Sequence, residues 1–178
     1  LIKEKMLIMD KSLAKLLASD KYKNMKYHLY FLPEIKQFID YPKLDEFNEI
    51  PDDFEEKREK GENDDFICEI IRSDNVNQFD DFIYKTNFSL KSCINPSVYE
   101  TNIFLNKRSP SLIEYATFFG SIHIFNYLFE KGVNLTPSLW IYAVHSNKLE
   151  MINLLEKNKV GPEDATYEQS FLESIKCH

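Results

Sequence analysis

Apolar residues at the start of the chain recur at steps of four and three positions, which is the spacing of one face of an α-helix. The residues on this stripe are Ile2, Met6, Met9, Leu13 and Leu16. We therefore predict a helix over residues 1–18. A second helical stretch is expected over residues 22–40, where Pro33 should open a new turn or kink the helix because it lacks a backbone N–H.

From residue 66 onward, one apolar pattern occurs three times. Its first half occupies residues 67–74, 113–120 and 140–147, and in each copy a second apolar run follows a short polar corner. The corners are Asp74-Asn75, Gly120-Ser121 and Asn147-Lys148. Each copy predicts two short helices around a tight turn. Repetition at this scale indicates a solenoid, in which each helix pair buries its apolar face only against its neighbours.

Polar residues ahead of the apolar runs predict where helices begin. A serine or threonine directly before a proline fits an N-cap followed by the first helical position, so we expect helices to start after Ser109 and Thr136. Asn75 with Gln78 is similar to a capping box. Thr166 should open one more helix that runs to the end of the sequence, as the first helix of an incomplete last repeat.

Aligned in this way, the copies resemble ankyrin repeats, whose inner helix follows the pattern T-P-L-H-x-A-A-x-x-G and whose outer helix follows x-E-I-V-x-L-L. Ile113, Ala116 and Gly120 occupy the Leu, first Ala and Gly positions of the inner helix. The outer-helix positions are filled by Ile122, Ile124, Phe125 and Leu128, and in the next copy by Leu149, Glu150, Met151, Ile152, Leu154 and Leu155.

The intervals between the corners depart from the family's period of about 33 residues. Gly120 and Asn147 are 27 residues apart, so the β-hairpin finger of the family is expected to be trimmed. Asp74 and Gly120 are 46 residues apart, which places an insertion at residues 85–109, with a loop and a short helix near residues 97–105. The tetrapeptide T-P-L-H does not occur in the sequence.

Residues 57–178 resemble, more narrowly, the divergent ankyrin-repeat proteins of parasitic protists such as trichomonads. The segments that carry this resemblance are 111–116, 118–121 and 136–140. In that family an N-terminal domain of unknown function precedes more regular repeats. The resemblance implies an all-α, ankyrin-like helix-turn-helix solenoid with trimmed β-hairpin fingers and an N-terminal helical segment. It implies a role as an interaction scaffold and no chemistry.

The acidic charge of the chain is concentrated in one segment. The 178 residues carry a formal net charge of −7 at pH 7, and residues 45–65 contain eleven acidic and three basic residues. Such a run is typical of a solvated linker, and an acidic docking peptide is the alternative. We therefore predict a helical segment over residues 1–44, an acidic linker over residues 45–65 and divergent repeats over residues 66–178. No large basic face emerges, so nucleic-acid binding is not expected.

Candidate chemistry is sparse. None of the histidines or cysteines stands at a metal-ligand spacing from another. They are His28, His123, His145 and His178, and Cys68, Cys93 and Cys177. We expect no metal site, no cofactor and no catalytic group from these spacings. Few and scattered cysteines fit reduced thiols inside the cell. No apolar stretch is long enough to predict a membrane span. We expect a cytoplasmic protein, with association with the cytoskeleton as an alternative.

The two positions before each corner are the candidate partner-binding residues. In ankyrin-like geometry these positions face the concave groove, where such solenoids bind other proteins. They are Arg72 and Ser73, Phe118 and Phe119, and His145 and Ser146. Aromatic and arginine side chains are the usual anchors of interfaces. The alternative for the two phenylalanines is that one of them packs into the preceding repeat.

The sequence thus predicts a non-catalytic scaffold that binds another protein through its concave face. A structural subunit of a larger assembly is the alternative, and an enzyme is a third hypothesis for which the sequence offers no placed catalytic group. The apolar stripe of residues 1–18 also needs a cover. It either caps the end of the repeats or docks in a groove of a partner.

Overall fold

The computed structural model describes residues 8–19, 25–39, 50–163 and 166–177. Within these residues the regular structure is α-helical, and the β-type contact is an isolated antiparallel bridge between Cys93 and Ser111. The predicted all-α class is confirmed.

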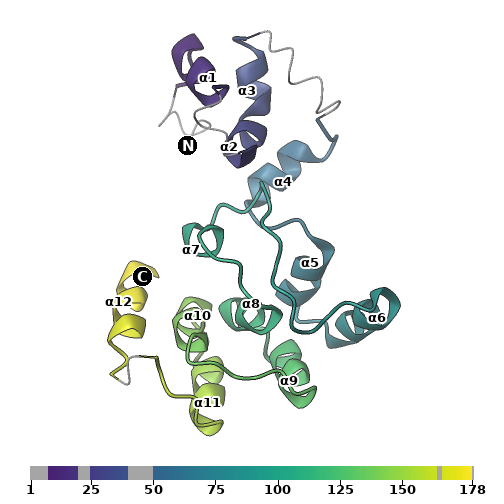
Figure 1. Cartoon of the computed structure of the whole chain (residues 1–178), viewed down its shortest axis with the longest axis vertical. Helices are drawn as coiled ribbons and strands as arrows, with labels where there is room; N and C mark the ends of the chain where they lie inside the picture. The colour runs from purple at the N-terminus through teal and green to yellow at the C-terminus, as the bar shows by residue number, and fades with distance from the viewer. Residues whose placement is uncertain (1–7, 20–24, 40–49, 164–165, 178) are drawn as a thin grey trace. The chain divides into compact units, whose positions relative to one another are not determined.

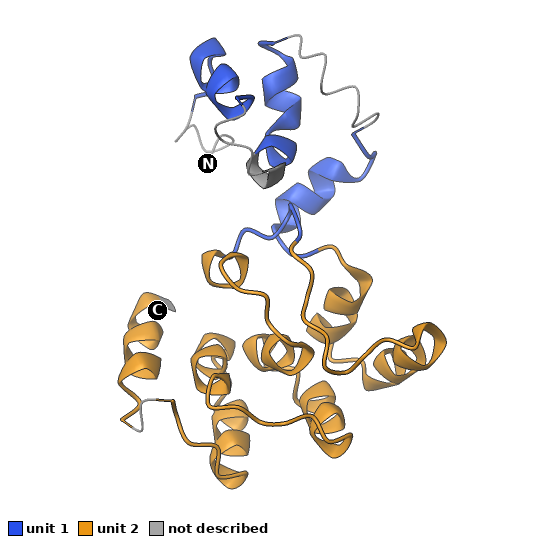
Figure 2. Cartoon of the chain, in the orientation of Figure 1, with its two compact units in different colours: residues 1–63, 97–102 blue, residues 64–96, 103–178 orange. Residues whose placement is uncertain are grey.

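The chain forms two compact units (Figure 2). The first comprises residues 1–63 and 97–102, and the second comprises residues 64–96 and 103–178. The insertion predicted between the first and second helix pairs is therefore divided between the two units.

The described residues of the first unit form helices α1 (Lys11–Leu17), α2 (Met25–Tyr30), α3 (Leu32–Lys36) and α4 (Phe54–Lys60) (Figure 1). Helix α1 contacts α3, and Ala18, Leu32 and Ile35 form a small buried cluster. Pro33 lies in the first turn of α3, where its missing N–H has no helical partner to lose. The predicted break at this proline is confirmed.

The helix predicted over residues 1–18 is shorter in the structure. Helix α1 begins after Asp10, whose side chain accepts a hydrogen bond of 2.7 Å from the backbone N–H of Leu13. A carboxylate at this position satisfies an N–H group that has no partner within the helix, and so fixes the helix start. Met9 is buried outside the helix, whereas Leu16 of the predicted stripe is 48% exposed. The stripe residues outside the described part of the chain are Ile2 and Met6.

The acidic segment predicted as a linker contains helix α4, whose first residue, Phe54, is buried. The guanidinium of Arg58 donates hydrogen bonds of 3.0 and 2.6 Å to the carboxylate of Glu34 in α3, and one of 3.1 Å to the carbonyl of Tyr30. Burial acts to lower the pKa of Arg58, but the hydrogen bond and the charge of Glu34 outweigh it and raise that pKa. The prediction of a solvated linker is therefore wrong for residues 54–60.

Residues 97–102 of the insertion pack on the end of α4. The carbonyl oxygen of Gly61 accepts hydrogen bonds from the backbone N–H of Thr101 at 3.0 Å and from its Oγ1 at 2.9 Å. Tyr99 lies edge to face against Phe54, with 5.5 Å between the ring centroids. Gly61 has a φ of 65°, and a Cβ there would lie 2.6 Å from Thr101 Oγ1. Both the backbone conformation and the close approach favour glycine.

The second unit contains helices α5 (Phe66–Arg72), α6 (Val76–Thr86), α7 (Ile103–Asn106), α8 (Leu112–Phe119), α9 (Ile122–Glu130), α10 (Leu139–Ser146), α11 (Leu149–Lys157) and α12 (Glu168–Cys177) (Figure 1). The three predicted helix pairs, α5–α6, α8–α9 and α10–α11, are confirmed. Their first helices contact one another in order: α5 contacts α8, and α8 contacts α10. Helix α12 continues this series by contacting α10, and α6 contacts α9.

The three polar corners have the same backbone conformation. Asp74, Gly120 and Asn147 all lie in the left-handed region, with φ of 51°, 64° and 51°. Helices commonly end in this way, and Gly, Asn and Asp tolerate the conformation best. Ala116 and Ala143 stand four residues before two of these corners and are fully buried. Small side chains here allow the first helices to approach one another closely.

Two predicted helix starts are displaced along the chain. Ser111, not Ser109, caps α8: its Oγ accepts a hydrogen bond from the N–H of Glu114, whose carboxylate accepts one from the N–H of Ser111 at 2.8 Å. This reciprocal capping box satisfies two N–H groups at once, whereas Ser109 has no matching acid three residues on. Helix α10 begins at Leu139, and Thr136 lies in the turn before it.

The connections around the second and third helix pairs are short. Residues 131–138, between α9 and α10, contain turns and no strand. The short helix predicted near residues 97–105 is α7, which covers only Ile103–Asn106. Trp140, at the start of α10, is buried, and its indole N–H donates a hydrogen bond of 2.7 Å to the carbonyl of Val160.

Candidate functional site

Four of the six candidate binding residues form a continuous row across α5, α8 and α10. The guanidinium carbon of Arg72 lies 5.9 Å from the ring centroid of Phe119, and the rings of Phe119 and Phe118 are 5.0 Å apart. The ring of His145 stacks on Phe118 at 4.9 Å, with 28° between the ring planes. We call Arg72, Phe119, Phe118 and His145 the aromatic row. These side chains thus contact one another from helix to helix, and their place on a concave, partner-binding face stays a prediction.

The other two candidate residues, Ser73 and Ser146, each form a hydrogen bond with the backbone of their own helix. Ser73 Oγ donates a hydrogen bond of 2.8 Å to the carbonyl of Ile70 in α5. Ser146 Oγ donates one of 2.7 Å to the carbonyl of Ala143 in α10. Each hydroxyl thus donates to a carbonyl oxygen in the last turn of its own helix, where backbone carbonyls lack N–H partners within the helix. Ser73 remains exposed and Ser146 half-buried.

Helix α7 of the insertion covers one end of the aromatic row. The ring of Phe104 stacks on Phe118 at 5.8 Å and lies 4.1 Å from the ring of His145. It also meets Tyr142 edge to face at 5.1 Å. The guanidinium carbon of Arg108 lies 3.9 Å from the Phe104 centroid, a favourable cation–π distance. Phe104 and Phe118 are consequently buried.

Helix α12 contributes a carboxylate to the same end. Glu173 Oε1 lies 3.2 Å from Nε2 of His145, and its Oε2 accepts a hydrogen bond of 2.9 Å from Lys176. Burial acts to raise the pKa of Glu173, but the hydrogen bonds and charges of Lys176 and His145 outweigh it and lower that pKa. The His145 end of the row is thus occupied by side chains of the chain itself.

The other end of the row is more accessible. Arg72 and Phe119 are half-buried rather than buried. Nη1 of Arg72 donates a hydrogen bond of 2.9 Å to the hydroxyl of Tyr115, whose ring lies 4.8 Å from that of Phe119. These contacts hold the guanidinium and the phenyl ring in defined positions. A pre-positioned arginine beside an aromatic ring suits recognition, because little side-chain freedom is lost on binding.

Sequence reasoning missed the side chains that cover the row. Phe104 and Arg108 lie in the insertion, outside the repeated pattern, and Glu173 lies in the last helix. The apolar triplet Ile103-Phe104-Leu105 was a usable signal, because consecutive apolar residues in a polar insertion favour a buried site. Phe104 and Leu105 are buried, whereas Ile103 is 70% exposed. No comparable signal in the sequence pairs Glu173 with His145.

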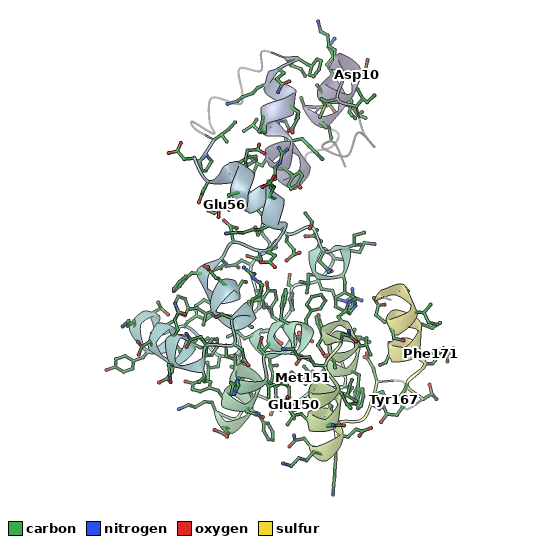
Figure 3. All side chains as sticks on the ribbon, turned by 180° about the vertical axis from the view of Figure 1, so that it is seen from behind. Asp10, Glu56, Glu150, Met151, Tyr167 and Phe171 are labelled. Atoms are coloured by element: carbon green, nitrogen blue, oxygen red, sulfur yellow. The ribbon has the colours of Figure 1, made fainter. Side chains whose placement is uncertain are left out.

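A second surface feature was not predicted. Helix α12 turns its apolar side outward: Phe171, Leu172 and Ile175 are 64%, 50% and 61% exposed. Phe171 lies on the side of α12 that points away from α10 (Figure 3). The helix instead packs through polar side chains, since Ser170 is buried and Glu173 reaches His145. We call Phe171, Leu172 and Ile175 the apolar face of α12.

No group of three or more His, Cys, Asp or Glu side chains among the described residues could hold a metal ion. Among the helices described, none has the length and hydropathy needed to cross a membrane. The chain matches no protein-family model, no curated protein and no solved structure.

Proposed function

We propose that this chain is a non-catalytic protein–protein interaction module, a divergent ankyrin-like solenoid that acts in the cytoplasm. A partner protein binds the side that carries the accessible end of the aromatic row, with Arg72 and Phe119 as anchors. The ankyrin-like pattern of the sequence and the serial packing of α5, α8 and α10 support the solenoid arrangement.

One observation carries this proposal: the Arg72–Phe119 pair is half-buried and held in place by Tyr115. Arginine and aromatic residues are enriched among interface residues whose truncation costs the most affinity. The covered end of the row, Phe118 and His145, supports the fold instead. Ser73 and Ser146 flank the surface and supply polar contacts at its rim.

Affinity capture from an extract of the source cells tests the proposal. The double variant Arg72→Ala with Phe119→Ser should lose the partner that the unchanged chain retains. The matched control is Tyr84→Ser with Lys85→Ala on α6, an exposed aromatic residue beside an exposed cation. A partner retained equally by all three proteins would refute binding at the aromatic row.

A structural subunit of a larger assembly is the second candidate, and the apolar face of α12 favours it. Exposed apolar residues gathered on one helix are typical of contact sites between proteins. The two functions differ in stoichiometry. An assembly subunit purifies with its neighbours at a fixed ratio, whereas a scaffold exchanges partners and is recovered with variable amounts of each.

A further inference from the structure

Ser109 and Pro110 have no part in the helix start that the sequence predicts for them. The N-cap of α8 is Ser111, which leaves Ser109 in irregular backbone between α7 and α8. The Ser109 side chain is exposed, and its hydroxyl has no hydrogen-bond partner among the described residues. An exposed loop hydroxyl with no role in the fold is available for chemistry.

The backbone is anchored on both sides of Ser109. The N–H of Arg108 donates a hydrogen bond of 3.1 Å to the carbonyl of Leu105, at the end of α7. The carbonyl of Pro110 accepts one of 2.7 Å from the N–H of Ile94. A residue that precedes proline is biased toward the extended conformation. Protein kinases bind their substrate segments in extended form, so a kinase can bind the segment around Ser109 without the unfolding of a helix.

The residues around Ser109 have the charge and backbone pattern that one class of kinases selects. Lys107 and Arg108 precede it and are exposed, and Pro110 follows it. Kinases distinguish substrates by such charge patterns. Proline-directed kinases favour a proline after the acceptor, because it brings no N–H that would lose its hydrogen-bond partner on binding.

The other serine or threonine that precedes a proline lacks these features. Thr136 stands before Pro137, with the uncharged residues Asn134 and Leu135 ahead of it. Its Oγ1 also lies 2.8 Å from Ser138 Oγ, within hydrogen-bond distance. Thr136 is therefore the poorer acceptor and serves as the internal control for Ser109.

We propose that Ser109 is phosphorylated by a proline-directed protein kinase that also recognises the cations of Lys107 and Arg108. The Ser109 Oγ forms a bond to the γ-phosphorus of ATP, the bond between that phosphorus and the β,γ-bridging oxygen breaks, and ADP leaves. The hydroxyl proton passes to the catalytic carboxylate of the kinase. This modification requires the proposed cytoplasmic location, where ATP is available, and does not depend on partner binding at the aromatic row.

A phosphate on Ser109 changes the contacts of Arg108. The guanidinium carbon of Arg108 lies 3.9 Å from the ring centroid of Phe104, and its Nη1 donates a hydrogen bond of 3.3 Å to the Phe104 carbonyl. A phosphoserine carries a charge of about −1.5 to −2, and its charge-assisted hydrogen bonds with arginine are stronger than an exposed cation–π contact. The phosphate therefore draws Arg108 away from Phe104, which covers the His145 end of the aromatic row.

Tandem mass spectrometry of the whole chain, purified from the source cells with phosphatase inhibitors present, tests the site. The spectra should place phosphate on Ser109 and none on Thr136. Purified chain incubated with ATP and a proline-directed kinase should also incorporate phosphate, whereas Ser109→Ala should not and Ser109→Thr should. Chain from the cells that carries no phosphate on Ser109, or equal incorporation by the unchanged chain and Ser109→Ala, overturns the proposal.

Amide hydrogen exchange tests the effect on Arg108. Residues 103–108 should exchange faster in the phosphorylated chain than in the unmodified one, and unmodified Arg108→Ala should show the same increase. Equal exchange with and without phosphate would show that Arg108 stays on Phe104. The Arg72→Ala with Phe119→Ser variant should be phosphorylated normally, which separates a failure of this site from a failure of partner binding.

Discussion

The carboxylate of Asp74 caps α9, the second helix of the next helix pair, since its Oδ1 accepts a hydrogen bond of 3.0 Å from the backbone N–H of Ile124. Its Oδ2 accepts a second one of 3.1 Å from the N–H of His123, and the His123 ring nitrogen Nδ1 lies 2.7 Å away. Ser121, which precedes α9, donates its hydroxyl hydrogen bond to the carbonyl of Ile71 instead. The first two helix pairs are thus joined by polar contacts as well as by apolar packing.

Replacing Asp74 should destabilise the second unit. Asp74→Ala removes the cap and places an alanine at a φ of 51°, a left-handed conformation that alanine tolerates less well than aspartate. We therefore expect a loss of about 1–2 kcal/mol in the free energy of unfolding. Asp74→Asn keeps an acceptor and tolerates the left-handed conformation, so its loss should be smaller. Urea denaturation measures both values. Equal losses for the two variants would argue against the cap.

The two adjacent phenylalanines of α8 should respond differently to substitution. Phe118 is buried between Phe104 and His145, so Phe118→Ser should lower the free energy of unfolding by about 3–5 kcal/mol. Phe119 is half-buried, and Phe119→Ser should leave helicity and the melting temperature nearly unchanged. Circular dichroism melts of both variants make the comparison. If Phe119→Ser unfolds the unit as readily as Phe118→Ser, Phe119 is a core residue and Arg72 remains the sole anchor.

The repeated helix pairs could be predicted because their corners obey a local rule. Asp74, Gly120 and Asn147 stand at the same point of the apolar pattern, and each residue type accepts the left-handed backbone that turns the chain. The members of the aromatic row stand one or two positions before these corners, so their order across the helices follows from the register of the three copies. Local spacing therefore sufficed for the three helix pairs and for the register of the candidate residues.

Contacts between distant segments could not be predicted in this way. The run of acidic residues at 45–65 suggested a solvated linker. Within that run, however, Phe54 is buried and Arg58 is paired with Glu34, both inside the first unit. The pairing of Arg58 with Glu34 spans 24 residues and leaves no periodic trace in the sequence. Phe104 covers the aromatic row from an insertion that has no counterpart in the other copies. Long-range pairs of this kind depend on tertiary geometry rather than on local pattern.

The Arg58–Glu34 pair should dominate the stability of the first unit. The Arg58 side chain is only 8% exposed, so Arg58→Ala leaves the partly buried carboxylate of Glu34 without its cation, at a cost of about 3–5 kcal/mol. Amide hydrogen exchange in α3 and α4 should accelerate accordingly. Lys60→Ala removes an exposed pair with Glu56 and should change exchange little. Protection of α3 that survives Arg58→Ala would contradict this role.

The docking of α12 on α10 should weaken in acid. Burial alone would raise the pKa of Glu173, but Lys176 and His145 lower it below its ordinary value of 4.5. A carboxyl group with a lowered pKa contributes stability that is complete above its unfolded value and is lost as pH falls through its folded value. Amide exchange of α12 should therefore rise below about pH 4.5.

Glu173→Gln serves as the test variant for this pH dependence. Its α12 should exchange faster already at neutral pH and should change less on acidification, because the titrating group is gone. Glu150→Gln alters an exposed carboxyl group on α11 and should keep the behaviour of the unchanged chain. An α12 whose exchange depends on pH equally in all three proteins would show that Glu173 does not control its docking.

Photo-crosslinking at position 119 tests partner binding at the aromatic row most directly. Phe119 is replaced by p-benzoyl-phenylalanine, and the same replacement of Tyr84, which is 87% exposed on α6, is the control. Irradiation in the source cells should yield a covalent adduct of the chain with one partner protein from position 119 and none of that mass from position 84. The absence of an adduct at position 119, or the same adduct from both positions, would contradict binding at the aromatic row.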